Sequence, residues 1–393
     1  MLLPSMPVWA EINLDSLRHN MMEIRSLVPS RSKIMAVVKA NAYGHGSVES
    51  SRVLIENGAN MLAVATLSEA VELRVAGITA PILILGYTSS EQAESILKWN
   101  ITSTVYSIQC AEGFNAAAKK VEGIINLHIK IDTGLGRIGF QPDEATVESL
   151  YMIKDMPGVN IEGIFTHFAL ADSEDKSYTR KQFNMFTGFL DRLTERGVNI
   201  PLKHTNNSAA IIDLPKFSLD LVRPGCILYG LYPSGGIKRD TVLLKPVMTL
   251  KTRVTHVKTV PPGTGVSYGL TYTTKSESCL GSISVGYADG YSRALSNKAE
   301  VWVRNNRAPV VGRVCMDQTM IDLTDLYKPA VGDSVVLFGD GCSGEPTASD
   351  VANWTGSITD EVVSSVSRRV PRVYLKDGRV VKVVDYLHEK KTV

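Results

Sequence analysis

A lysine stands at the end of a strongly apolar segment near the start of the chain. Ile34–Val38 is apolar throughout, and Lys39 follows it directly, ahead of a turn that contains Gly44 and Gly46. Removing an ammonium group from water is costly, so a lysine at the end of a buried strand can lose its proton and act as a nucleophile or base. The alternative is a lysine that extends its amine to solvent. Position alone leaves both interpretations open.

Further polar residues come directly after other β-rich segments. They are Asp132–Arg137, His167, Asn206–Ser208 and Arg223–Gly225. If these segments form a parallel barrel, their carboxyl ends meet at one rim, where barrel enzymes place their active sites. Loops after the last two strands often hold a phosphate, and Ser208, Gly225 and Cys226 offer a hydroxyl and backbone N–H groups for one. For Ser208 alone, helix capping is the simpler interpretation.

Eight β-rich segments must position these groups. They are Ile34–Val38, Met61–Thr66, Ile82–Gly86, Ile101–Tyr106, Leu127–Ile131, Ile161–Thr166, Leu202–Thr205 and Asp220–Val222. Segments with helical periodicity lie between most of them, and one such helix is predicted to start at a capping box, Thr66–Glu69, and to end at Gly77. Strands that alternate with helices predict an α/β fold, a (β/α)8 TIM-type barrel of about 230 residues. A doubly wound open sheet is the alternative.

The chain has 393 residues, too many for one ordinary core, which predicts two domains. After Pro233–Gly236 the segments become short and strand-like. Val301–Val303 and Pro309–Val314 flank a predicted turn at Arg304–Arg307, and Lys376–Gly378 is a hairpin signal between Val373–Leu375 and Arg379–Val384. We expect the barrel over residues 1–240 and a β-rich, C-terminal domain over residues 241–393. Roughly the first ten residues could pack with the second domain.

Composition narrows the function classes. The net charge of +2 gives no electrostatic reason to expect a nucleic acid or a membrane surface as a partner. No apolar run approaches the roughly 18 residues that span a bilayer, and the N-terminus does not resemble a signal peptide. The five scattered cysteines contain no CxxC pair, which predicts free thiols in a reducing cytoplasm.

Two other site types are disfavoured. The seven histidines form no HxH or HExxH pair, and no carboxylate cluster follows the strands, so we expect no metal. Gly134–Gly139 matches GxGxxG, but a dinucleotide site would need the glycines to open a helix directly. Here Phe140–Pro142 intervenes and the helix is predicted to begin near Asp143, so we expect the glycines to let a loop carry Arg137 to the rim.

The motifs as a set closely resemble those of the alanine racemases, which use pyridoxal 5′-phosphate (PLP). They run in the family's order over nearly the whole chain: AVVKANAYGHG at 36–46, HIKIDTGLGRIGF at 128–140, FTHFA at 165–169, HTNNSAA at 204–210, VRPGCILYG at 222–230, VSYGLTY at 266–272, SVGYADGYSR at 284–293, GRVCMDQTMIDLT at 312–324 and RRVPRVY at 368–374. The family fold is a PLP-binding barrel followed by a β domain.

The resemblance implies catalytic roles. Lys39 is the lysine that forms the internal aldimine and the base on one face of the substrate α-carbon, and Tyr268 is the opposite base, supplied by the second subunit of a homodimer with composite active sites. Two bases on opposite faces racemise a substrate without turning it over. His167 and Arg223 resemble the family's hydrogen-bond relay. Arg223 also resembles the residue that faces the pyridine nitrogen, where a guanidinium leaves the ring a weaker electron sink and favours quick reprotonation.

The resemblance also implies binding roles. Tyr43, Ser208, Gly225 and Cys226 match phosphate contacts, Arg137 and the Met316 N–H match contacts to the substrate carboxylate, and Tyr287 matches the active-site entrance. Lys130 matches a lysine that is carbamylated in many relatives. One departure is Arg368, which stands where some relatives have a tyrosine near the cofactor, and it leaves the size of the substrate pocket open.

These observations predict a cytoplasmic enzyme that interconverts L-alanine and D-alanine and supplies D-alanine for peptidoglycan. Three alternatives stay open: a racemase that also acts on serine, because a methyl pocket discriminates weakly against an added hydroxyl; a basic amino-acid decarboxylase of the same architecture; and a non-catalytic PLP carrier. The decarboxylase would need acidic residues for a distal ammonium group, and only Asp317 stands near the expected place. The carrier would not need a β domain with Tyr268.

Overall fold

The computed structural model describes residues 6–233 and 236–388, and these fall into two compact units. The barrel unit comprises Leu17–Ala42 and Ser47–Leu244. The sheet unit comprises the described residues of Met1–Ser16, Tyr43–Gly46 and Lys245–Val393. Ser234 and Gly235, in the segment where the predicted change of texture begins, lie outside the described residues.

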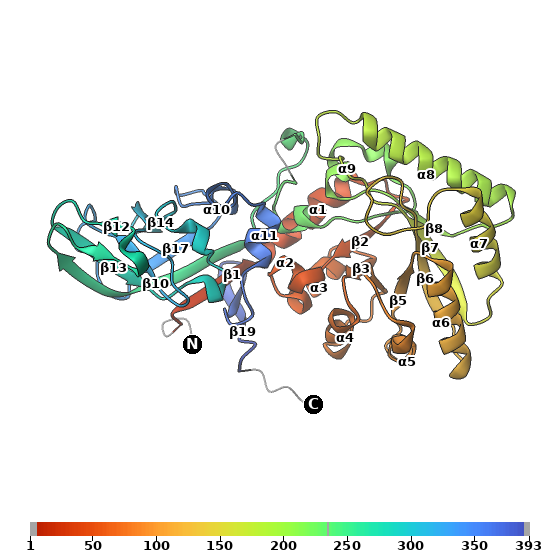
Figure 1. Ribbon diagram of the computed structural model, residues 1–393, viewed down its shortest axis with the longest axis horizontal. Coiled ribbons are helices and arrows are strands. Elements are labelled where there is room, and N and C mark those ends of the chain that lie inside the picture. Colours follow the sequence, from red (N-terminus) through yellow and green to blue (C-terminus); the bar gives the residue numbers. More distant parts are fainter. Residues whose placement is uncertain (1–5, 234–235, 389–393) are drawn as a thin grey trace. The chain divides into compact units, whose positions relative to one another are not determined.

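Eight parallel strands close into a barrel in the order β2 to β9 (Figure 1). Their bounds are β2 Lys33–Val37, β3 Met61–Val64, β4 Ile82–Ile84, β5 Thr102–Val105, β6 Ile125–Lys130, β7 Val159–Phe165, β8 Leu202–His204 and β9 Leu221–Val222. Closure between β2 and β9, where Ile34 pairs with Val222, confirms the barrel and excludes the open sheet. Most predicted strands ran too far into the rim loops; Thr66, for example, is a helix cap.

Helices cover the outside of the barrel strands in Figure 1. They are α1 Leu14–Leu27, α3 Ser47–Glu56, α4 Leu67–Val75, α5 Ala93–Lys98, α6 Ile108–Lys120, α7 Glu144–Lys154, α8 Ser177–Glu195 and α9 Ser208–Asp213. The predicted capping box of α4 is present, because Thr66 accepts from the Glu69 N–H and the Glu69 carboxylate accepts from the Thr66 N–H. The helix ends at Val75, two residues before Gly77, whose φ is +83°.

The sheet unit contains a nine-stranded sheet in the order β15-β14-β17-β10-β1-β18-β19, with β13 branching from β10 and β16 pairing with β13. The strands are β1 Val8–Asn13, β10 Met248–Val260, β13 Ser278–Ile283, β14 Glu300–Val303, β15 Asn306–Pro309, β16 Thr319–Asp322, β17 Ser334–Phe338, β18 Arg372–Lys376 and β19 Arg379–Val384. A separate ribbon joins β11 Gly265–Val266 to β12 Tyr272–Thr273, and two helices follow, α10 Ala348–Thr355 and α11 Thr359–Ser364. The N-terminal strand β1 therefore lies in this sheet, antiparallel to β10 and parallel to β18.

The two predicted hairpins form, one of them with a correction. Asp377 and Gly378 have φ of 50° and 68° and join β18 to β19 as a two-residue turn. In the other hairpin the predicted turn over residues 304–307 is wrong, because Arg304 and Asn305, with φ of 48° and 63°, complete the turn by themselves. The returning strand β15 consequently begins at Asn306 rather than at Pro309.

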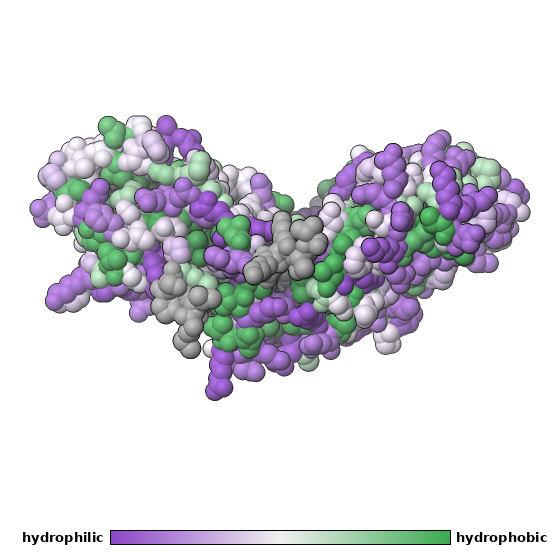
Figure 2. Space-filling view, turned by 90° about the horizontal axis from the view of Figure 1, so that it is seen from below, coloured by the Kyte–Doolittle hydropathy of each residue, from purple (hydrophilic) through white to green (hydrophobic). Residues whose placement is uncertain are grey.

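The surfaces and side-chain clusters carry few special features. Hydrophilic and hydrophobic side chains are interspersed over the face shown in Figure 2. Within the described parts of the chain, no helix combines the length and the apolar character needed to cross a bilayer. Over the same two ranges, 6–233 and 236–388, no group of three or more His, Cys, Asp or Glu side chains could hold a metal ion. No disulfide joins the five cysteines, all of which are described.

Candidate active site

Lys39 opens a single left-handed turn, α2 (Lys39–Tyr43), at the carboxyl end of β2. Left-handed backbone costs an L-residue about 1–2 kcal/mol, so consecutive left-handed residues need support from their surroundings. The Glu69 carboxylate accepts from the first amide of the turn at 2.6 Å, and Asn41 Oδ1 accepts from the Ser47 N–H at 2.9 Å. The four residues after Lys39 all have φ between 52° and 55°: Ala40, Asn41, Ala42 and Tyr43.

Glycines complete this turn for a steric reason. Gly44 and Gly46 have φ of 82° and 93°. A Cβ on Gly44 would collide with the carbonyl oxygen of Val363, and one on Gly46 would collide with the hydroxyl of Tyr374. Within the sheet unit, both close packing and backbone conformation therefore require glycine at these two positions.

Arg223 is the buried hub of the rim. Its Nη1 donates to His204 Nδ1 at 2.7 Å, and its Nη2 contacts the carbonyl oxygens of Thr166 and Thr205 at 2.8 and 3.0 Å and His167 Nδ1 at 3.3 Å. Among the described residues, its Nε–H meets no acceptor. Burial, and then the charge of Arg137, lowers the pKa of Arg223 to about 9, so the guanidinium stays charged at neutral pH.

A chain of neutral histidines continues from Arg223 into the barrel interior. Burial lowers the pKa of both His204 and His128. Because His204 Nδ1 accepts from Arg223, its proton sits on Nε2 and is donated to His128 Nδ1 at 2.8 Å. The remaining nitrogen of His128, Nε2, lies 3.5 Å from Glu162 Oε2. The chain therefore leads from the guanidinium to a half-buried carboxylate.

His167 is also kept neutral. Burial, followed by the charges of Arg223 and Lys130, lowers its pKa well below the usual range. With Nδ1 turned toward the guanidinium of Arg223, the proton of the neutral ring belongs on Nε2. The structure thus brings His167, after β7, and Arg223, after β9, together at the rim where the sequence predicts both.

Lys130 is a buried amine at the end of β6. Its Nζ donates to the Ile131 carbonyl at 2.8 Å and lies 5.5 Å from the ring centroid of Phe165, which also faces the Arg223 guanidinium at 5.2 Å. Burial, then the charge of Arg223, lowers the pKa of Lys130 to about 7, against the opposing effect of Asp132. A substantial share of Lys130 is therefore a neutral amine at neutral pH.

The loop after β6 is organised by one carboxylate. Asp132 Oδ1 accepts from the amides of Gly134, Leu135 and Gly136 at 2.9, 2.9 and 3.2 Å. These amides lower the pKa of Asp132 in spite of its burial. Helix α7 begins only at Glu144, with Asp143 as its cap, which confirms that the glycines do not open a helix. The loop carries Arg137 as an exposed side chain.

Ser208 does not cap helix α9. Asn207 caps α9 instead, through a hydrogen bond from the Ala210 N–H at 3.1 Å. The Ser208 Oγ accepts from the Gly225 N–H at 2.9 Å, which joins the loops after β8 and β9. The hydroxyl proton of Ser208 is left to meet an anion, whereas the Gly225 amide is already engaged. Cys226 begins a 3-10 turn, Cys226–Tyr229, directly after it.

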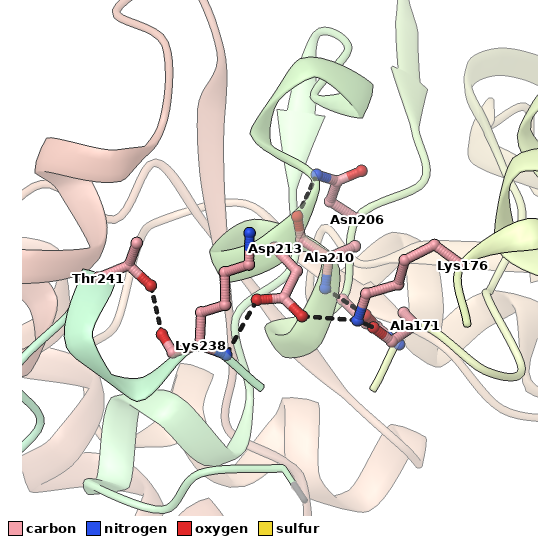
Figure 3. A network of polar contacts seen from close by, with 8 residues as sticks. Ala171, Lys176, Asn206, Ala210, Asp213, Lys238 and Thr241 are labelled. Atoms are coloured by element: carbon pink, nitrogen blue, oxygen red, sulfur yellow. Dashed lines mark hydrogen bonds and ion pairs between the residues drawn. The ribbon is translucent and has the colours of Figure 1, made fainter. Parts of the chain in front are cut away.

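The far end of α9 is fixed by a polar network (Figure 3). The Lys176 ammonium donates to Asp213 Oδ2 at 2.6 Å and to the Ala171 carbonyl at 2.8 Å, and Asp213 Oδ1 accepts from the Lys238 N–H at 3.3 Å. Asn206 donates to the Ala210 carbonyl at 3.1 Å. The helix that presents Ser208 is therefore held at both ends, and one partner comes from the loop after His167.

Tyr268 lies in the sheet unit on an irregular turn. The preceding residue, Ser267, has φ of 62° and donates its hydroxyl to the Arg313 carbonyl at 2.6 Å. Tyr268 is 71 % exposed, beside a pocket of about 330 Å³ that Ser267, Cys315 and Gln318 help to line. The sequence places Tyr268 between glycines, and the structure presents its phenol to solvent in this unit.

Tyr287 and Met316 lie on two loops that touch. The Tyr287 N–H donates to the Cys315 carbonyl, and the Ala288 N–H donates to the Met316 carbonyl, both at 3.1 Å. Met316 is 52 % exposed, and within the described ranges its own N–H has no acceptor. That amide is thus available to an anion, as the resemblance implies. Arg368, the departure from the family pattern, stacks its guanidinium 5.1 Å from the Tyr386 ring centroid.

The part of this network inside the barrel was not predicted from the sequence. His128, His204 and Glu162 were not predicted as site residues, and neither was Phe165, whose ring stacks on His204 at 4.7 Å. The sequence does contain a signal for it. His128 stands two residues before Lys130, and alternate residues of a strand face the same side, so both side chains are expected inside the barrel. Polar residues at such positions in a barrel strand point to an interior network rather than an apolar layer.

Comparisons with known proteins cover nearly the whole chain. Residues 12–233 match the family model described as alanine racemase, N-terminal domain, and residues 247–374 match alanine racemase, C-terminal domain. An alanine racemase of Desulforamulus reducens is 52 % identical over 369 residues, covering 94 % of this chain and 99 % of that protein. The solved alanine racemase of Clostridium difficile 630 has a TM-score of 0.94 at 45 % identity, covering 98 % and 99 % of the two chains. That of Bacillus anthracis with bound L-Ala-P has a TM-score of 0.92 at 38 % identity, covering 97 % and 98 %.

Proposed function

This chain belongs to the alanine racemase family and is an isomerase, and from that premise we propose that it interconverts L-alanine and D-alanine with PLP and two bases of its own sequence. The observation that carries the proposal is the rim itself. A buried, charged Arg223 keeps an Nε–H for an acceptor, and on the same rim Ser208 has a hydroxyl that does not cap a helix.

The residues at this rim fit PLP. The pyridine nitrogen is an acceptor and suits the Nε–H of Arg223, while the phosphate suits the Ser208 hydroxyl and the first amides of the 3-10 turn at Cys226. Lys39 would hold the aldehyde carbon, and Tyr43 would add a hydroxyl toward the phosphate. When bound, PLP supplies an electron sink that makes the α-hydrogen of the amino acid acidic.

The chain's own residues then move the proton. Lys39 takes or returns it on one face of the α-carbon, and Tyr268 does so on the other face. A neutral His167, with its proton on Nε2, and an Arg223 that is charged at neutral pH keep the surrounding hydrogen bonds in one arrangement during both transfers. Arg137 and the Met316 N–H would orient the substrate carboxylate, and Tyr287 would line the entrance.

We infer a homodimer in which each site combines a barrel unit with the partner's sheet unit. Four bulky side chains of the sheet unit support this proposal, because they are exposed without being needed for its core. Their exposed fractions are 71 % for Tyr268, 65 % for Leu270, 43 % for Tyr287 and 52 % for Met316. Exposed apolar clusters of this kind are typical of protein interfaces.

Lys130 is proposed to be carbamylated. Its lowered pKa, about 7, supports the proposal, because only the neutral amine adds to carbon dioxide. The neutral amine forms an N–C bond to carbon dioxide and releases one proton, which leaves an anionic carbamate. Starting from the protonated lysine, a second proton is lost first. That anion would lie among the positive charges of Arg223 and Arg137, which already disfavour a protonated Lys130.

A cytoplasmic enzyme that supplies D-alanine for peptidoglycan is our proposal for the setting, and the absence of disulfides supports a reducing compartment. Serine remains the second candidate substrate, because Arg368 replaces a tyrosine of some relatives and a methyl pocket rejects a hydroxyl weakly.

The test combines the visible spectrum of the purified protein with assays of both alanine enantiomers. We expect absorption of bound PLP and conversion of either enantiomer toward an equal mixture. Much faster turnover of L-serine would replace alanine with serine as the principal substrate. Release of carbon dioxide from lysine or ornithine, or bound PLP with no racemisation, would contradict the proposal.

A further inference from the structure

Two loops of the sheet unit lie back to back. One carries Tyr287 in a 3-10 turn, Tyr287–Asp289, and the other is the tight turn Cys315–Gln318, closed by a hydrogen bond from the Cys315 N–H to the Gln318 carbonyl at 2.9 Å. Their backbones touch at Gly286, where a Cβ would collide with the carbonyl oxygens of Cys315 and Met316. The Met316 N–H, at the tip of the tight turn, has no acceptor within the described ranges.

One guanidinium bridges both loops. Arg369 Nε lies 2.7 Å from Asp289 Oδ1, and its Nη2 donates to Asp317 Oδ1, also at 2.7 Å. Asp289 belongs to the Tyr287 turn, and Asp317 is the residue next to Met316. A rigid fork with two directed donors suits this task, whereas a single ammonium would serve one carboxylate at a time.

The inner half of the bridge is fixed from several sides. Asp289 is 1 % exposed, and its Oδ2 accepts from the Gly286 N–H at 2.9 Å. Its backbone carbonyl accepts from the Ser367 N–H at 3.1 Å, two residues before Arg369. Burial raises the pKa of Asp289, and the Gly286 amide and Arg369 oppose that effect. The outer half differs, because the side chain of Asp317 is 56 % exposed.

This asymmetry has a functional meaning. A buried, multiply held carboxylate gives Arg369 a fixed position, and the exposed Asp317 then receives its position from Arg369. The side chains at the tip of the tight turn, Met316 and Asp317, are exposed, while two backbone hydrogen bonds from the Tyr287 turn hold the carbonyls of Cys315 and Met316. The bridge joins the same two loops through side chains, so it consequently supports the backbone contacts that set the direction of the Met316 N–H.

We propose that Arg369 is a positioning residue for the substrate carboxylate: bridging Asp289 to Asp317, it aims the Met316 N–H at that carboxylate. The inference rests on the proposed role of Met316 and extends it to a residue that makes no substrate contact itself. Hydrogen bonds to charged groups change binding roughly ten- to hundredfold, so misdirecting this amide weakens substrate binding without removing either base.

Three variants separate this role from a purely structural one. Asp317→Ala removes only the exposed half of the bridge and leaves the buried carboxylate paired. Arg369→Lys keeps a positive charge for Asp289 but cannot reach both carboxylates as a fork. Arg304→Gln is the matched control, because Arg304 forms an equally close two-point pair with Asp333 in the same unit, at 2.6 and 3.0 Å.

The measurements use the PLP-loaded enzyme. We expect KM for both alanine enantiomers to rise about tenfold in Asp317→Ala and Arg369→Lys, with kcat within about threefold of the parent. Because the two enantiomers have equal free energies, kcat/KM must stay equal in the two directions. Propionate has the carboxylate and carbon chain of alanine but no amine, so its inhibition constant should rise by a similar factor.

The outcomes are distinct. Unchanged KM and unchanged propionate inhibition in both bridge variants, with alanine racemised normally by the parent, would overturn the role of Arg369 alone. A loss confined to kcat or to thermal stability would also overturn it. An equal KM increase in Arg304→Gln would show that breaking any ion pair of the sheet unit weakens substrate binding, and it would contradict the inference. Failure of the parent enzyme to racemise alanine would instead reject the proposed function.

Discussion

The left-handed turn after Lys39 predicts that a small substitution, Ala40→Gly, raises the free energy of unfolding. Ala40 is exposed with φ of 53°, so Ala40→Gly removes a methyl group that contacts little and relieves the backbone strain. The relief is about 1–2 kcal/mol, and the greater flexibility of glycine in the unfolded chain takes back about 0.5–1 kcal/mol. The expected net effect is a gain of roughly 0.5–1 kcal/mol in the free energy of unfolding.

Ala145→Gly is the matched control. Ala145 is also exposed, but it lies in the first turn of the right-handed helix α7. The same chemical change there should lower the free energy of unfolding by about 1 kcal/mol. For a unit of this size, 1 kcal/mol moves Tm by roughly 2–4 °C, so the two variants should shift in opposite directions by amounts that calorimetry resolves.

Thermal unfolding of both variants, measured with and without added PLP, provides the assay. If Ala40→Gly destabilises the protein as much as Ala145→Gly does, the residues after Lys39 do not adopt the left-handed turn in solution. Glu69, which accepts from the Ala40 N–H, offers an internal check. Glycine keeps the backbone N–H that donates to Glu69. A lost hydrogen bond therefore cannot explain a fall in the free energy of unfolding in Ala40→Gly.

Three further predictions concern the site. Lys39→Ala should lose the visible band of bound PLP, whereas Tyr268→Phe should keep the band and lose racemisation activity at least about a hundredfold. Parental activity in Tyr268→Phe would exclude Tyr268 as a base. Tyr327→Phe is the control, because Tyr327 is also exposed, at 79 %. His128→Leu leaves the buried His204 Nε2–H without its acceptor and should lower the free energy of unfolding by about 1–3 kcal/mol in urea titrations; no change would mean that this hydrogen bond is absent. Lys130 binds its proton up to pH 10.5 when unfolded but only to about pH 7 when folded, so without carbon dioxide the stability it contributes should rise between those values. Lys130→Met should flatten that slope, and a parent without the slope would contradict the lowered pKa.

The sequence predicts much of the fold because its signals are local. The Thr66–Glu69 capping box and the Asp377–Gly378 turn depend on residues a few positions apart, and both form as expected. The alternation of apolar strands with helical segments likewise specifies a barrel, because neighbouring strands must pair in parallel. Strand ends were less predictable, since Thr66 has a β-prone side chain and yet serves the next helix.

The same distinction between local and long-range signals applies to the candidate site. The rim residues were predictable because each follows a strand, whereas the histidine chain depends on which strand faces meet inside the barrel. Nothing local predicts that Ala40 and Ala42 adopt left-handed backbone, because glycine is the usual residue there. Asn207 rather than Ser208 caps α9, and two adjacent capping candidates cannot be separated by residue type alone.

The position of β1 between β10 and β18 has a consequence for how the protein is made. Its hydrogen-bonding partners Met248–Thr252 and Arg372–Leu375 leave the ribosome more than two hundred and more than three hundred residues later. At cellular elongation rates of about 5–20 residues per second, the first strand waits for tens of seconds. The barrel can close in that interval, so the nascent chain carries an apolar strand, VWAEIN, with neither edge paired. The period of greatest exposure to aggregation or to chaperones is therefore set by the N-terminus, and it ends only when the last strands emerge.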